Sequence, residues 1–117
     1  MTLQQERGRK GEDLAITYLQ NIGYRIEERN FRSGRSEIDI IATFENTLVF
    51  LEVKARTSIK FGNPESFVDE AKAAKVIEGA ESYIAHINWN GPIRFDIISI
   101  IYNSKEPEIR HFKDAFY

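Results

Sequence analysis

The sequence contains no cysteine, which excludes both a disulfide framework and a metal site built on thiolates. This absence fits a reducing compartment, and we expect the protein to be cytoplasmic. No apolar run approaches the roughly 18 residues that suggest a membrane span, and the N-terminal stretch MTLQQERGRKGED lacks the apolar centre of a signal peptide. We therefore expect no membrane partner.

Neither sign of charge dominates, since 16 Lys and Arg face 18 Asp and Glu for a net charge of −2. This balance argues against a protein whose whole surface clamps a polyanion. Residues 1–60 hold ten basic and nine acidic residues, so a basic patch would be local. The candidate nucleic-acid contacts in this half are Arg32, Arg35 and Arg56. The alternative is that these arginines are ordinary solvated charges.

The chain has 117 residues and shows no repeat, linker or low-complexity tract, so we predict a single domain over residues 1–117. Helical spacing of apolar residues predicts a helix over 3–21 and a second over 66–87. Strands are predicted over 24–32, 37–44, 47–57, 93–102 and 108–112, the fourth of them buried on both faces. The first three strands are joined by the tight turns 33–36 and 45–46 and form an antiparallel meander.

The resulting α-β-β-β-α-β-β order predicts an α/β fold with a mixed central sheet flanked by helices. The strand, helix, strand unit over 48–102 is expected to be a right-handed parallel crossover. Its two strands, TLVFLEVKART and IRFDIISIIY, are expected to be central in the sheet.

The segment LVFLEVKAR, residues 48–56, begins as a buried strand and then presents Glu52 and Lys54 two residues apart. Alternate residues of a strand share a face, so these two side chains lie together. Pairing outward from the 45–46 turn sets Asp39 opposite Glu52, and the same alternation puts Glu37 and Ile41 on the face of Asp39. The sequence thus predicts two acids and a lysine side by side.

Two carboxylates across neighbouring strands repel unless positive charge lies between them. Lys54 supplies one charge, and Mg²⁺ or Mn²⁺ would supply the rest, because a hard cation commonly takes one or two protein carboxylates together with waters and phosphate oxygens. Such an array fits metal-dependent phosphodiester hydrolysis. The alternative for these residues is a structural ion-pair network at a strand end.

Glu12 is a candidate third acid, because it lies on the flank of the first helix's apolar stripe and Gly8 and Gly11 would let that end of the helix approach the sheet. A capping or surface role for Glu12 stays open. For Arg94 and Asp96, which share a face of their strand, a salt bridge that supports the fold is favoured over catalysis.

Asp39 followed by Glu52-Val53-Lys54 resembles the D…(D/E)-x-K signature of the PD-(D/E)XK nuclease superfamily, which includes restriction enzymes and Holliday-junction resolvases. The blocks GRKGEDLAITYLQNIGY, RNFRSGRSEIDII, LVFLEVKAR, FGNPESFVDEAKAAKV and RFDIISI are similar to those of the YraN-type family of small predicted endonucleases. One departure is Ser36, where that family usually has glycine.

This resemblance implies a restriction endonuclease-like αβββαβ core and a magnesium-dependent endodeoxyribonuclease that acts on DNA, including branched or junction DNA. It implies that Asp39, Glu52 and Glu12 are metal ligands, that Lys54 is the catalytic lysine and that Lys72 contacts the site. A resolvase that makes paired cuts would act as a homodimer. The alternative is a nucleic-acid-binding module that keeps the nuclease fold with little or no turnover.

Overall fold

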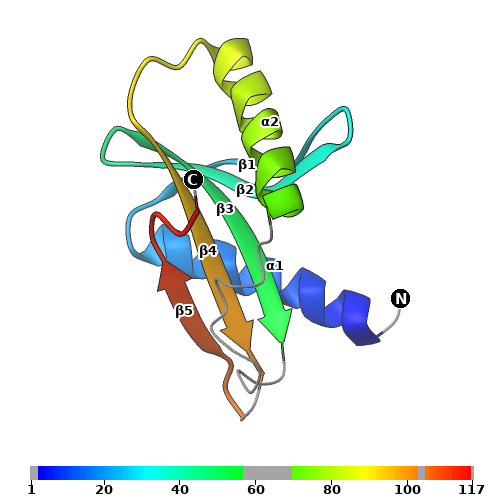
Figure 1. Ribbon diagram of the computed structural model, residues 1–117. Coiled ribbons are helices and arrows are strands. Elements are labelled where there is room, and N and C mark those ends of the chain that lie inside the picture. Colours follow the sequence, from blue (N-terminus) through cyan, green and yellow to red (C-terminus); the bar gives the residue numbers. More distant parts are fainter. Residues whose placement is uncertain (1–2, 57–69, 103–104, 117) are drawn as a thin grey trace.

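The computed structural model describes residues 3–56, 70–102 and 105–116 (Figure 1). Its elements are, in chain order, α1 (Leu3–Asn21), β1 (Arg25–Ser33), β2 (Ser36–Phe44), β3 (Thr47–Arg56), α2 (Glu70–Ile87), β4 (Ile93–Ile101) and β5 (Glu108–Phe112). The order is the one that the sequence predicts. The predicted first turn of the second helix, residues 66–69, lies outside the described residues.

The strands form one five-stranded sheet whose spatial order follows the chain, β1-β2-β3-β4-β5. β1, β2 and β3 are antiparallel neighbours, as the meander predicted, and β3 runs parallel to β4. Glu45 and Asn46 both have left-handed backbones, with φ of 48° and 65°, which is the geometry of a two-residue hairpin turn whose twist matches the strands. The mixed sheet of the predicted α/β fold is therefore confirmed.

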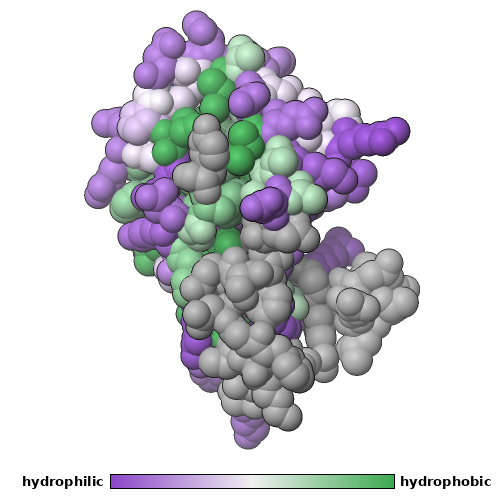
Figure 2. All heavy atoms as spheres, viewed as in Figure 1, coloured by the Kyte–Doolittle hydropathy of each residue, from purple (hydrophilic) through white to green (hydrophobic). Residues whose placement is uncertain are grey.

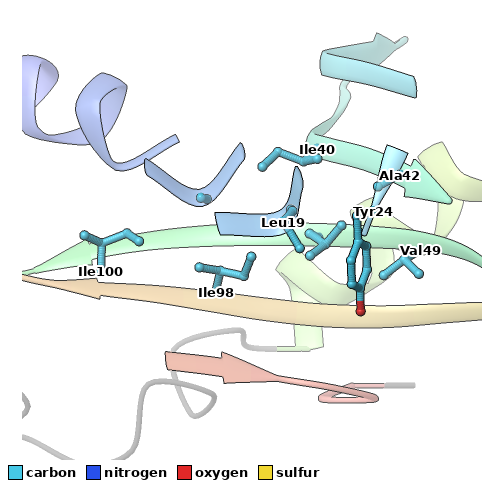
Figure 3. Close-up of a cluster of buried hydrophobic side chains, with 9 residues drawn as sticks. Leu19, Tyr24, Ile40, Ala42, Val49, Ile98 and Ile100 are labelled. Atoms are coloured by element: carbon cyan, nitrogen blue, oxygen red, sulfur yellow. The ribbon is translucent and has the colours of Figure 1, made fainter. Parts of the chain in front are cut away.

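The two helices cover opposite faces of the sheet. One apolar cluster joins α1 to the sheet (Figure 3), and its fully buried members are Ala15, Leu19, Ile40, Ala42, Val49, Leu51, Ile98 and Ile100. A second cluster lies under α2 and contains Ile38, Ile41, Leu48, Phe50, Val76, Ala80, Tyr83 and Phe95. Residues from Phe95 to Ile101 of β4 are all buried, which confirms that this strand is central and covered on both faces.

Close contacts of small residues seat both helices. A Cβ added at Gly11 would lie 3.3 Å from the Cβ of Ala55, so α1 approaches β3 as closely as its glycines predicted. At Gly79 of α2 an added Cβ would lie 3.1 Å from the Cβ of Ser36. Ser36 is itself buried, so the serine at the family's usual glycine position packs directly under α2.

The face seen in Figure 2 is mostly hydrophilic at its margins, with hydrophobic atoms gathered in the upper middle, where α2 and the start of β4 lie. Two exposed isoleucines, Ile87 and Ile93, come from these elements. Within the described ranges, no helix combines the length and apolar content needed to cross a membrane.

Side-chain alternation is interrupted once in β2. Ile38 and Ile41 both pack in the cluster under α2, whereas Ile40 packs in the cluster under α1. Strict alternation would place Ile38 and Ile40 on one face of the sheet. The prediction that Glu37, Asp39 and Ile41 share a face is therefore wrong, because the strand switches faces between residues 38 and 40.

Candidate active site

Asp39 and Glu52 meet where β2 and β3 part. The backbone ladder between the two strands ends at the pair Ile40 and Leu51, one residue short of the predicted pairing of Asp39 with Glu52. Beyond that pair, the carboxylates of Asp39 and Glu52 join the two strands. The Asp39 N–H donates to Glu52 Oε2 at 3.3 Å, and the Val53 N–H donates to Asp39 Oδ2 at 2.8 Å. The two acids are neighbours, as the sequence predicted, but each binds the other strand through its carboxylate.

Burial makes both carboxylates resist ionisation. Only 1% of Glu52 is exposed, and burial raises its pKa. Burial, and then the charge of Glu52, raise the pKa of Asp39 to about 7, although the Val53 N–H opposes this shift. Positive charge close to the pair would therefore favour the ionised form of both acids.

Two lysines accompany the acids. Lys72 of α2 places its Nζ 3.0 Å from Glu52 Oε1, so the lysine that the family resemblance assigned to the site does reach it. Burial lowers the pKa of Lys72, but the charge of Glu52 and its hydrogen bond outweigh this effect and leave that pKa raised. Lys54 is half-buried, two residues along β3 from Glu52, and its charge favours the ionised form of that acid.

Glu12 approaches the same region from α1. Its charge is one of the causes that raise the pKa of Asp39. Arg29 of β1 lies on the other side of Glu12, with its Nε 3.4 Å from Glu12 Oε1 and an Nη 2.6 Å from Asp13 Oδ1. Glu12 is thus a half-buried acid that is held by its ion pair with Arg29. Among the described residues, no hydrogen bond joins Glu12 to Asp39 or Glu52.

The candidate nucleic-acid contacts lie in two places. Arg32 and Arg35 are exposed on the β1–β2 hairpin, and Arg32 lies 3.5 Å from Glu37. Arg56 is half-buried at the end of β3, where its carbonyl accepts a hydrogen bond from the Tyr102 N–H. The two hairpin arginines are thus accessible to solvent, whereas Arg56 is only partly so.

The donor set fits a hard divalent cation. No group of three or more His, Cys, Asp or Glu gathers as a metal cluster in the part of the chain that the structure describes. The fit therefore depends on Asp39 and Glu52, and two carboxylates completed by water are an ordinary set for Mg²⁺. Burial is the main cause that raises the pKa of both carboxylates, and a bound cation would oppose that effect.

A second polar cluster lies on the α1 face of β4 and is centred on Asp96. Asp96 is fully buried and accepts two hydrogen bonds from Arg94, both at 2.8 Å, which confirms the predicted salt bridge. His111 Nε2 lies 2.7 Å from the same carboxylate, and the Asp114 N–H donates to it at 3.0 Å. This cluster fastens β5 and the following segment to the sheet.

Sequence reasoning missed the role of Arg29. It was counted only as one of many basic residues, because its ion pairs with α1 depend on the face that it occupies in β1. That face follows from the register shift in β1 between Ile26 and Glu28, which strand periodicity does not reveal.

Fold and geometry together define a mixed α/β protein with a partly neutralised acid pair at a fork in its sheet. Sequence comparison assigns the family. The sequence profile of the Uncharacterised protein family UPF0102 matches residues 11–100, and the chain belongs to this family, which is the YraN-type family that its motifs resemble.

Relatives in this family match along nearly their whole length. The UPF0102 protein of Flavobacterium psychrophilum is 44% identical over 117 residues, covering 100% of this chain and 98% of that protein. The UPF0102 protein of Bacteroides thetaiotaomicron is 41% identical, covering 100% and 97%. The UPF0102 protein of Persephonella marina is 47% identical over 111 residues, covering 94% and 92%.

Proposed function

We propose that this protein is a metal-dependent endonuclease that hydrolyses DNA phosphodiester bonds, built on a restriction endonuclease-like core. The observation that carries the proposal is the contact between Asp39 and Glu52 at the fork of β2 and β3, with two lysines beside it. Two lysines accompany the two acids, yet burial still leaves the pKa of Asp39 raised to about 7, which supports a role for a further cation at this site.

Asp39 and Glu52 would hold Mg²⁺ or Mn²⁺, and Glu12, whose charge contributes to the raised pKa of Asp39, would be the third acid of the site. When bound, the cation polarises the phosphoryl group and lowers the pKa of a coordinated water. The Val53 N–H fixes Asp39 Oδ2, and Lys72 Nζ fixes Glu52 Oε1, so both carboxylates are oriented before the substrate arrives.

Lys54 is the residue best placed to handle the attacking water. Its ammonium follows Glu52 on the same strand face and can donate a hydrogen bond to that water or to a phosphate oxygen as negative charge develops. Arg32 and Arg35 on the β1–β2 hairpin would hold the DNA backbone. The family resemblance extends the substrate range to branched or junction DNA, and paired cuts would need a homodimer with two such sites.

The test is cleavage of duplex, single-stranded, flap and four-way-junction DNA by the purified protein in Mg²⁺ or Mn²⁺. We expect product from the wild type and a loss of roughly 100-fold or more in Asp39→Ala and Lys54→Met. Glu108→Gln, which removes an exposed acid of β5, is the matched control and should cleave normally. Cleavage that persists unchanged in Asp39→Ala would rule out this site.

The alternative function is nucleic-acid binding without turnover. It is favoured if the wild type binds DNA in a strongly salt-dependent manner yet forms no product with either metal.

A further inference from the structure

Asn30 has an unusual backbone conformation for a residue inside a strand. Its φ is +54°, in the left-handed region, although it lies within β1. Residues other than glycine rarely adopt this region, and asparagine is one of the few that tolerate it. An extended strand does not call for such a residue, so the conformation needs a local reason.

The left-handed residue coincides with a switch of faces in β1. Arg29 points to the α1 side, where it pairs with Glu12 and Asp13. Phe31, two residues later, packs in the cluster under α2, with its ring edge-to-face on Tyr83. Residues two apart in a regular strand share a face, so the side-chain alternation of β1 reverses at Asn30.

The same switch occurs directly across the ladder in β2. The pairs Arg29 with Ile40 and Phe31 with Ile38 flank one position in each strand, so Asn30 and Asp39 lie between the same two ladder pairs. The side-chain alternation therefore reverses at the same place in both strands, and Asp39 is the β2 residue at the reversal.

The switch accounts for the position of the Asp39 carboxylate. In a regular β2, Asp39 would continue the β2–β3 ladder beyond Ile40 and Leu51. Instead its N–H is directed to the Glu52 side chain and its carboxylate reaches the backbone N–H of Val53. The fork between β2 and β3 begins where the side-chain alternation of β1 and β2 reverses.

We propose that Asn30 is a positioning residue for the candidate active site. The left-handed backbone of Asn30 reverses the side-chain alternation of β1 and β2 at the same place, and this reversal directs Asp39 toward Glu52 and Val53. The catalytic consequence rests on the proposed nuclease function, whereas the structural step does not. Asn30 acts through Asp39 and has no direct part in the chemistry.

The test compares Asn30→Gly, which permits the left-handed conformation, with Asn30→Val, whose β-branched side chain disfavours it and favours an extended strand. The structural readout is hydrogen exchange of the Val53 amide by NMR, with the amides of β4 as the internal reference. We expect Asn30→Gly to protect Val53 as the wild type does, and Asn30→Val to raise its exchange roughly tenfold or more over the reference amides.

Asn88→Val is the matched control. Asn88 also has a left-handed backbone, with φ of 57°, but it follows the end of α2 rather than lying opposite Asp39. The Asn88→Val variant should lower the unfolding temperature without selectively exposing the Val53 amide. If Asn30→Val is too unstable to assign, Asn30→Ala provides a milder version of the same change.

The catalytic readout is DNA cleavage by the same variants, with kcat measured separately from KM. We expect Asn30→Val to lose roughly 100-fold in kcat, because a misplacement of about 1 Å has that order of effect, and Asn30→Gly to retain wild-type kcat. Unchanged Val53 exchange in Asn30→Val would overturn the proposal. Selective exposure of Val53 in a protein that never cleaves DNA would support the positioning role and refute the nuclease function.

Discussion

At the scale of single residues, Asp39 is an acid whose ionised form the fold disfavours. Burial and the neighbouring Glu52 raise its pKa to about 7, well above the 3.8 of an exposed aspartate. The folded protein therefore binds this proton more tightly than the unfolded chain does. Stability from this group is complete below pH 3.8 and is lost as the pH rises through about 7.

Asp39→Asn should consequently stabilise the metal-free protein in a pH-dependent way. The variant removes the charge but keeps an oxygen that can accept the Val53 N–H, so we expect a gain of roughly 2 to 4 kcal/mol in unfolding free energy at pH 8. The gain should shrink between about pH 7 and pH 4, where the wild-type carboxyl becomes protonated. Urea unfolding in EDTA at several pH values measures it.

The control for this prediction is Glu78→Gln, which neutralises an exposed acid of α2 and should change stability little at any pH. A gain in Asp39→Asn that is the same at pH 4 and pH 8 would show that the carboxylate charge is not its cause.

At the scale of elements, β5 depends on the polar cluster around Asp96. Burial raises the pKa of Asp96, but hydrogen bonds from His111, Arg94 and the Asp114 N–H outweigh it, so the pKa is lowered overall. The stabilisation is therefore present above pH 3.8 and is lost as the pH falls through the lower pKa of the folded state.

Asp96→Asn should detach this edge of the sheet, because it leaves Arg94 and His111 facing a neutral partner. We expect a loss of about 3 kcal/mol at pH 7, since removing one partner of a buried ion pair is strongly destabilising. Denaturant unfolding gives the size of the loss, and hydrogen exchange of the β5 amides locates it.

The matched control for the edge strand is Glu108→Gln. Glu108 pairs with Arg110 on the exposed side of β5, and an exposed pair contributes about 0.5 kcal/mol or less. Equal losses in the two variants would mean that the edge is held by β-ladder pairing alone and that the buried cluster is dispensable.

At the scale of the whole molecule, the sequence specified the fold better than the site. Element order, the meander and the central β4 are set by periodicity and by the turn at Glu45 and Asn46, which are local signals. The contact of Asp39 with Glu52 followed from counting outward from that turn. The face of Glu37 did not, because the count assumes regular alternation and β2 breaks it between residues 38 and 40.

The charge distribution of the whole molecule decides how it would bind DNA. With a net charge of −2, affinity must come from a few local contacts, and the exposed Arg32 and Arg35 are the candidates on the described surface. Each phosphate contact contributes about −0.9 to the slope of log K against log salt for duplex DNA. Replacing both arginines with alanine should reduce that slope by about 2 and weaken binding to all sequences alike.

Fluorescence anisotropy across a salt series, with Ca²⁺ in place of Mg²⁺ to limit cleavage, measures this slope. The double variant Lys105→Ala with Lys113→Ala removes the same charge near β5, which lies at the sheet edge opposite β1. If the hairpin binds DNA, this control keeps the wild-type slope, because counterion release counts only cations that touch phosphate. An equal reduction in both variants would mean that net charge, and not the β1–β2 hairpin, governs DNA binding.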